Sequence, residues 1–132
     1  MIKSQSEIID KMYEIVGIER QTYSPQEYAK EEGTYQPGCM WPQYFFESYP
    51  VFTKAKCWDI LNILVDYCGI TIDMEPGPLG SGYYVVTWLT DEQIEAEELN
   101  EVLAAVVVRY YEELKPDLKE QIKRILCGET RY

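Results

Sequence analysis

The sequence predicts an α+β fold in which helices pack on a small antiparallel sheet of two to three strands. Several stretches carry apolar residues at three- and four-residue spacing, which is typical of amphipathic helices. Residues 70–75 alternate apolar and polar side chains, and residues 83–89 are β-branched and aromatic, as half-buried strands are. Residues 76–82 between them mix proline with glycine, which favours a hairpin loop. The predicted order is α-(β)-α-loop-α-β-β-α-α.

The first third of the chain is predicted to hold two helices. The capping-box pattern of residues 4–7 begins the first helix, and Gly17 ends it. A second capping box at residues 24–27, with proline at the first helical position, begins a short helix that ends at Gly33. Residues 18–23 are compatible with a third strand, which would give the hairpin the further partner that an isolated two-stranded sheet needs.

The helix before the hairpin has signals at both ends, with Thr53 as N-cap and Gly69 as C-terminal stop. Its expected apolar face consists of Cys57, Trp58, Ile60, Leu61, Leu64, Val65 and Cys68. We expect a single core cluster that contains Trp58, Leu61, Leu64, Val85, Leu103 and Val106.

The chain after the hairpin is expected to form two more helices. Residues 90–93, Thr-Asp-Glu-Gln, have the spacing of a capping box and place two acids in a first turn, where the helix dipole favours negative charge. An apolar stripe then continues to Leu114, and Pro116 ends this helix. The apolar residues after Pro116 predict a last short helix that stops at Gly128.

Length and charge restrict the possible partners. A chain of 132 residues is long enough to bury a core without disulfides or metal, and we expect a single domain over residues 1–132. The formal net charge of −11 argues against nucleic acid or an anionic membrane as a direct partner, because phosphate binding relies on Lys and Arg. There is no apolar run of membrane-spanning length and no apolar signal-peptide region, so we expect a cytoplasmic protein.

Residues 34–52 are rich in aromatic side chains and punctuated by proline and glycine. Disordered segments are poor in aromatics, so these rings are expected to be buried. They are covered either within the domain, by an ordered loop that closes over the sheet, or by a partner. The candidate binding residues in this segment are Trp41, Tyr44, Phe45 and Tyr49.

Negative charge is concentrated in residues 89–114, where eight carboxylates accompany one arginine, a balance of −7. Carboxylates one helical turn apart, such as Glu97 and Glu101, would form an acidic ridge on the predicted helix. The ridge is either a solvated helix face or a docking surface for a basic groove, including one that normally holds nucleic acid. The candidate partner-binding residues are Glu92, Glu95, Glu97, Glu98 and Glu101.

Residue types limit the possible chemistry. The chain contains no histidine, which excludes Ser-His and Cys-His catalysis and histidine metal ligands. The four cysteines are too scattered for a metal knuckle or a redox pair, so we expect buried free thiols and no metal or cofactor. Asp73 and Glu75 share a strand face and would be the carboxylates of a hydrolase, although a solvated polar face explains the same spacing. The cysteines are Cys39, Cys57, Cys68 and Cys127.

One region resembles a known group of proteins. The motifs are Cys57-Trp58-Asp59-Ile60-Leu61, the Gly69 stop, a strand, Gly82-Tyr83-Tyr84-Val85-Val86 and a following helix with Leu103-Ala104-Ala105. Together, residues 53–114 resemble the small α-β-β-α sandwich proteins encoded by phages and prophages. The resemblance implies an accessory or host-interference (anti-defence) protein rather than a metabolic enzyme. Residues 23–52 and the helix after Pro116 depart from the pattern, and no functional residue is carried over.

These observations favour a non-enzymatic interaction protein that binds a basic protein surface, for example that of a nucleic-acid-binding effector. The aromatic segment would supply apolar anchors, since Tyr and Trp dominate binding hot spots. A homodimer is the other arrangement considered, because a second subunit could cover the outer face of the sheet. The alternative functions are binding of a nucleotide-like ligand stacked on Trp41 or Tyr44, and a carboxylate-dependent hydrolase.

Overall fold

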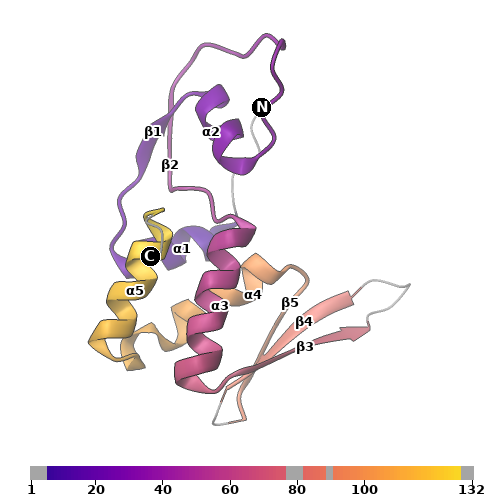
Figure 1. Cartoon of the computed structure of the whole chain (residues 1–132), viewed down its shortest axis with the longest axis vertical. Coiled ribbons are helices and arrows are strands. Elements are labelled where there is room, and N and C mark those ends of the chain that lie inside the picture. Colours follow the sequence, from indigo (N-terminus) through magenta and orange to yellow (C-terminus); the bar gives the residue numbers. More distant parts are fainter. Residues whose placement is uncertain (1–5, 77–81, 89–90, 129–132) are drawn as a thin grey trace.

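The computed structural model describes residues 6–76, 82–88 and 91–128 (Figure 1). It contains helices and two antiparallel sheets, so the predicted α+β class is confirmed. The helices are α1 (Glu7–Val16), α2 (Pro25–Glu32), α3 (Lys54–Cys68), α4 (Leu99–Tyr110), the short 3-10 helix η2 (Tyr111–Glu113) and α5 (Pro116–Leu126). The strands are β1 (Gln21–Tyr23), β2 (Phe46–Ser48), β3 (Thr71–Pro76), β4 (Gly82–Thr87) and β5 (Gln93–Ala96).

The end signals of α2 and α3 work as predicted. The hydroxyl oxygen of Ser24 accepts a hydrogen bond from the N–H of Glu27 at 3.2 Å, and the Glu27 carboxylate accepts one from the N–H of Ser24 at 3.3 Å. Thr53 caps α3 by accepting from the N–H of Lys56 at 3.3 Å. Gly69 ends α3 in the left-handed conformation, with φ 65°, which glycine adopts without steric cost.

The first and last helices lie where they were predicted, but the start of α1 differs. Its N-cap is Ser6, without a side-chain cap, instead of Ser4 of the predicted capping box, which lies outside the described residues; the predicted end at Gly17 is confirmed. α5 begins with Pro116 at its first position, where a missing N–H costs nothing. None of the helices in the described ranges is long and apolar enough to cross a membrane.

The main core is shared by α1, α3, α4, α5 and one face of the three-stranded sheet. Figure 1 shows α3 in the middle, with α5 on one side and the sheet on the other. The predicted core residues Leu61, Leu64, Leu103 and Val106 are buried in this cluster. The largest fully buried side chains of this cluster are Tyr13, Met12, Ile60, Ile63, Leu64, Leu103, Ile122 and Leu126.

Two predicted core residues lie elsewhere. Trp58 is 53% exposed, so its assignment to the core was wrong. Successive helix residues are rotated by about 100°, and the buried face of α3 is centred on Cys57, Ile60 and Leu64, which leaves Trp58 at the edge of the helix. Val85 is buried, but it belongs to the opposite face of the sheet and is not part of the main cluster.

The predicted third strand exists, but it pairs with a different partner. β1 pairs antiparallel with β2, which lies inside the aromatic segment, and Tyr23 is aligned with Phe46. Their side chains form a second small cluster with Tyr28 and Val51. Figure 1 shows this unit at the opposite end of the molecule from β3–β5. The aromatic segment therefore does not close over the three-stranded sheet.

The prediction that a helix begins at Thr90 and includes residues 93–96 is wrong, because those residues form the strand β5. Asp91 has φ 65°, a left-handed conformation that Asp tolerates, and its N–H donates to the carbonyl of Trp88 at 2.9 Å. The N–H of Trp88 donates to the carbonyl of Glu92 at 2.9 Å, which continues the ladder between β4 and β5. Thr90 itself lies outside the described residues. α4 begins eight residues later than expected, at residue 99.

The sheet has the strand order β3-β4-β5 and two different faces. The inner face packs on the main core through Ile72, Tyr84, Val86, Ile94 and Ala96. The outer face carries the alternate residues, and the register places Val85 between Asp73 and Glu95. This face is polar and acidic, as expected for the exposed side of an antiparallel sheet.

Candidate functional site

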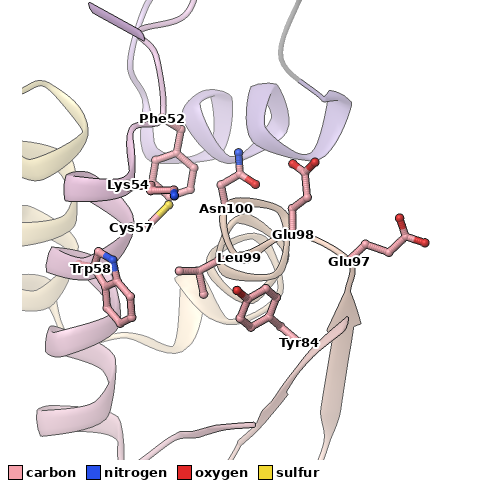
Figure 2. A pocket seen from close by; sticks show the side chains of 9 residues that line it. All are labelled: Phe52, Lys54, Cys57, Trp58, Tyr84, Glu97, Glu98, Leu99 and Asn100. Atoms are coloured by element: carbon pink, nitrogen blue, oxygen red, sulfur yellow. The ribbon is translucent and has the colours of Figure 1, made fainter. Parts of the chain in front are cut away.

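A cleft of about 400 Å³ opens between α3, β4 and the first turn of α4 (Figure 2). Residues of α3, β4 and the start of α4 meet here, because the antiparallel strands β3 to β5 bring the chain back beside α3 after that helix has ended. The cleft has an apolar floor and a charged rim. Its lining residues are Phe52, Lys54, Cys57, Trp58, Tyr84, Glu97, Glu98, Leu99 and Asn100.

The apolar part of the cleft is made by side chains that the core leaves partly uncovered. Figure 2 shows Trp58 from α3, Leu99 from α4 and Tyr84 from β4 lying around one space. Tyr84 and Leu99 are half-buried against the core, whereas more than half of the Trp58 surface is exposed. Phe52, just before α3, is buried behind them. A large, accessible indole in a concave apolar setting is typical of a binding surface.

The loop that carries Phe52 is held in place by Lys56. The Lys56 ammonium donates to the carbonyl of Val51 at 2.8 Å and to that of Leu126 at 3.3 Å, and it lies 4.0 Å from the Glu31 carboxylate. Burial lowers the pKa of Lys56 from its ordinary value, while Glu31 opposes that shift. Lys56 therefore joins the loop before α3 to the end of α5, and so positions one side of the cleft.

The rim is acidic. Glu97 and Glu98 lie in the turn between β5 and α4, and Lys54 lies opposite them at the start of α3. A neighbouring depression of about 440 Å³ shares Lys54 and Glu98 with the cleft and adds Glu32 and Glu101. Four carboxylates and the Lys54 ammonium therefore line these two hollows. The first N–H groups of α4 carry a partial positive charge, which stabilises Glu98 and Glu101 at this end of the helix.

The structure separates the five acids that the sequence placed on one helical ridge. Glu97, Glu98 and Glu101 stay together at the cleft and its neighbouring depression. Glu95 lies on β5, on the outer face of the sheet. Glu92 is engaged within the chain, since its carboxylate pairs with the Arg109 guanidinium at 3.2 Å and accepts a hydrogen bond from the Tyr110 hydroxyl. The acidic helix is therefore corrected to an acidic turn and helix start.

The four aromatic residues proposed as anchors are also separated. Tyr49 stacks on Tyr13 of α1, with ring centroids 5.6 Å apart, and so serves the core. Trp41, Tyr44 and Phe45 line a separate depression of about 500 Å³, which shares no residue with the cleft or its acidic rim. One face of Trp41 is already covered by Tyr35, at 5.7 Å between centroids. Tyr44 and Phe45 are exposed.

The thiols differ in their surroundings. All four cysteines are free, but Cys39 and Cys127 are exposed, which corrects the expectation that all would be buried. Cys57 is buried beneath the cleft, and burial raises the pKa of its thiol to about 12. Its nucleophilic thiolate is therefore suppressed at neutral pH. Among the residues that the structure describes, no group of three Cys, Asp or Glu side chains could hold a metal ion.

Sequence reasoning missed Trp58, Tyr84 and Leu99 as site residues. One available signal was the position of Ile63, which is fully buried and shifts the apolar face of α3 away from Trp58. Comparison with known proteins adds no further constraint: the chain matches no protein-family model and has no significant similarity to a curated protein or to a solved structure. The function is therefore argued from the geometry and charge of the cleft.

Proposed function

We propose that this is a non-enzymatic binding protein that holds a basic segment of a partner protein in the cleft between α3 and the turn from β5 to α4. The partner inserts an apolar side chain against Trp58, Tyr84 and Leu99. Its neighbouring Lys or Arg side chains pair with the carboxylates of the rim. In this proposal the chain acts as an accessory or host-interference protein, as the resemblance of residues 53–114 to phage-encoded proteins implies. The third strand, β5, departs from their α-β-β-α order.

The observation that carries the proposal is the exposure of Trp58 in a concave apolar cleft with an acidic rim. Aromatic side chains in such places contribute most of the binding free energy at protein interfaces, while the surrounding polar rim contributes less. A cleft of about 400 Å³ has the volume of a small ligand site, and an apolar side chain with its flanking residues fills it.

Charge determines which partners are favoured. The net charge of −11 attracts basic partners and repels acidic ones before contact, and the rim carboxylates continue that preference at the site. Lys54 is the exception, because its ammonium would face the incoming positive charge. Lys54 lies at the opposite side of the cleft from Glu97. It therefore favours the orientation in which the basic side chains of the bound segment lie on the Glu97 side.

The depression beside the aromatic loop supports a second candidate function. Its volume of about 500 Å³ and the exposed rings of Tyr44 and Phe45 suit a planar ligand. We rank it second because Tyr35 already covers one face of Trp41.

A selection from a random peptide library tests the main proposal. Peptides retained by the wild-type protein should combine one large apolar residue with flanking Lys or Arg, and they should be lost when Glu97→Lys and Glu98→Lys are introduced together. The matched control is Glu112→Lys with Glu113→Lys, an exposed acid pair away from the cleft that gives the same change in net charge. Selected peptides without positive charge, or equal losses in both double variants, would contradict the proposal.

A further inference from the structure

β3 forms an edge of the three-stranded sheet, since the strand order is β3-β4-β5. Figure 1 shows it along the lower border of the sheet, with β4 between it and β5. All its residues are exposed apart from Ile72, which is half-buried, and Met74 is 65% exposed. An edge strand of this kind presents backbone groups that can pair with another chain.

The register shows which backbone groups are available. The N–H of Trp88 donates to the carbonyl of Glu92, so these two residues form a hydrogen-bonded pair. Such pairs recur at every second residue of an antiparallel ladder, so the backbone N–H and C=O groups of Val86 and Tyr84 also point toward β5. Those of Tyr83, Val85 and Thr87 then point toward β3, where they meet Glu75, Asp73 and Thr71. It follows that the N–H and C=O groups of Ile72 and Met74 point outward, away from the sheet. Pro76 ends this row because it has no N–H.

The side chains along this edge specify the added strand. Asp73 and Glu75 share the outer face of the sheet, and Ile72 and Met74 share the inner face. A strand paired with β3 therefore places alternate residues beside carboxylates and beside apolar side chains. Opposite charges in directly facing positions stabilise a strand pair, and like charges destabilise it.

A second copy of this chain does not meet that requirement. If the β3 strands of two copies pair antiparallel about Asp73, the two Asp73 side chains face each other. Each Glu75 then faces Thr71 of the other copy, next to the two Asp73 carboxylates. A shift of the register by two residues keeps the acids on one face. Each copy also carries a net charge of −11, which opposes association.

We propose that the free edge of β3 accepts an extended segment of a partner protein, as an added antiparallel strand in which Lys or Arg alternates with apolar residues. The basic residues lie opposite Asp73 and Glu75, in the non-hydrogen-bonded positions where side chains approach most closely. The apolar residues lie opposite Ile72 and Met74, and their backbone groups form the hydrogen bonds to β3. This site is separate from the cleft at Trp58.

The pairing makes a prediction that backbone methylation can test. The probe is the blocked peptide Lys-Val-Lys-Val-Lys-Val-Lys, whose valine N–H groups would face β3. N-methylation of the three valines should weaken binding to the full-length protein by about tenfold or more, because it removes hydrogen bonds to β3. N-methylation of lysines should leave binding within about threefold, because those N–H groups face solvent. The binding is measured by fluorescence anisotropy of the labelled peptide at fixed salt.

Protein variants separate this edge from the cleft and from general charge attraction. Asp73→Lys with Glu75→Lys should abolish binding of the peptide, whereas Glu112→Lys with Glu113→Lys and Trp58→Ala should preserve it. A peptide of the same composition with its four lysines in one block should bind more weakly than the alternating one. Equal effects of methylation at valine and at lysine, a stronger effect at lysine, or equal binding of the block peptide would overturn the proposal.

Discussion

The indole ring of Trp88 lies stacked on the phenol ring of Tyr110, with centroids 4.0 Å apart and an angle of 5° between the ring planes. The contact joins the end of β4 to the last residue of α4. Glu92 strengthens the connection by accepting a hydrogen bond from the Tyr110 hydroxyl and pairing with Arg109. Trp88 and Glu92 are thus fixed to the last turn of α4, and β5 runs from there along the helix toward its first turn. This places Glu97 and Glu98 at the cleft.

Removal of the Trp88 ring should therefore destabilise the fold. We expect Trp88→Ala to lower the free energy of unfolding by about 2–3 kcal/mol, less than for a fully buried indole because Trp88 is only half-buried. Trp41→Ala is the matched control, since Trp41 stacks on Tyr35 in the outlying loop, and it should cost less than about 1 kcal/mol. Urea unfolding followed by circular dichroism measures both. Equal losses in the two variants would contradict the structural role of Trp88.

The position of α4 against the core can be tested at Leu103. Leu103 is fully buried in the main cluster, and Leu103→Ala should cost about 2–5 kcal/mol through lost contacts and a residual cavity. The control is Glu112→Ala at an exposed position, which should change stability by less than about 0.5 kcal/mol. An unchanged melting temperature for Leu103→Ala would mean that this face of α4 is not in the core.

The thiols should react in an order set by burial. Cys39 and Cys127 are exposed and should react first with a disulfide reagent at pH 8, while half-buried Cys68 should follow more slowly. Cys57, with its thiol pKa raised to about 12, should react only when the protein unfolds. Peptide mapping after timed labelling identifies each site. Rapid labelling of Cys57 in the folded protein would contradict its burial beneath the cleft.

The same pKa shift predicts a loss of stability in alkali. The Cys57 thiol holds its proton more tightly in the folded chain than in the unfolded one, so its contribution to the free energy of unfolding is complete below the ordinary thiol pKa of about 9.0. That contribution should be lost as the pH rises from about 9.0 to about 12. Cys57→Ala should make stability fall less steeply over this interval in urea titrations. An identical pH slope in wild type and variant would contradict a raised pKa.

Lys54 provides a test of the charge pattern around the cleft. Lys54→Glu should tighten binding of a selected basic peptide by about threefold to tenfold at low salt, because it removes the ammonium that faces the partner. The gain should shrink as salt is raised toward about 1 M, where the screening length falls to about 3 Å. Lys119→Glu on α5 is the control for a general change in charge. A similar gain in that control would mean that the effect is not local to the cleft.

Local signals explain which parts of the fold were predictable. Ser24, Thr53 and Gly69 act within one or two turns, so their residue types alone locate helix ends. The region after Thr87 was not predictable in the same way, since its acids and polar residues fit a helix start as well as a turn. The distinguishing features were the alternation in residues 93–96 and the five-residue step from Ile94 to Leu99, which breaks helical spacing. In the structure, pairing with β4 makes residues 93–96 a strand and not the start of a helix.

The cleft was less predictable than the fold because it depends on three distant segments. The exposure of Trp58 follows from which face of α3 meets α4 and α5, and a residue at the edge of an apolar face can lie on either side of that boundary. The grouping of Glu97, Glu98 and Glu101 was expected from their positions in the sequence, but on one helix face. The structure instead places two of them in the turn before α4.

The most direct test of the proposed function is the affinity of a selected basic peptide for Trp58→Ala relative to Tyr67→Ala. Both residues are exposed aromatics on α3, at 53% and 64%, but only Trp58 lines the cleft beside the acidic rim. Isothermal titration calorimetry should show binding weakened about 30-fold or more by Trp58→Ala, which corresponds to a hot-spot residue, and changed less than about twofold by Tyr67→Ala. Equal affinities for the two variants, with both still folded, would contradict binding in this cleft.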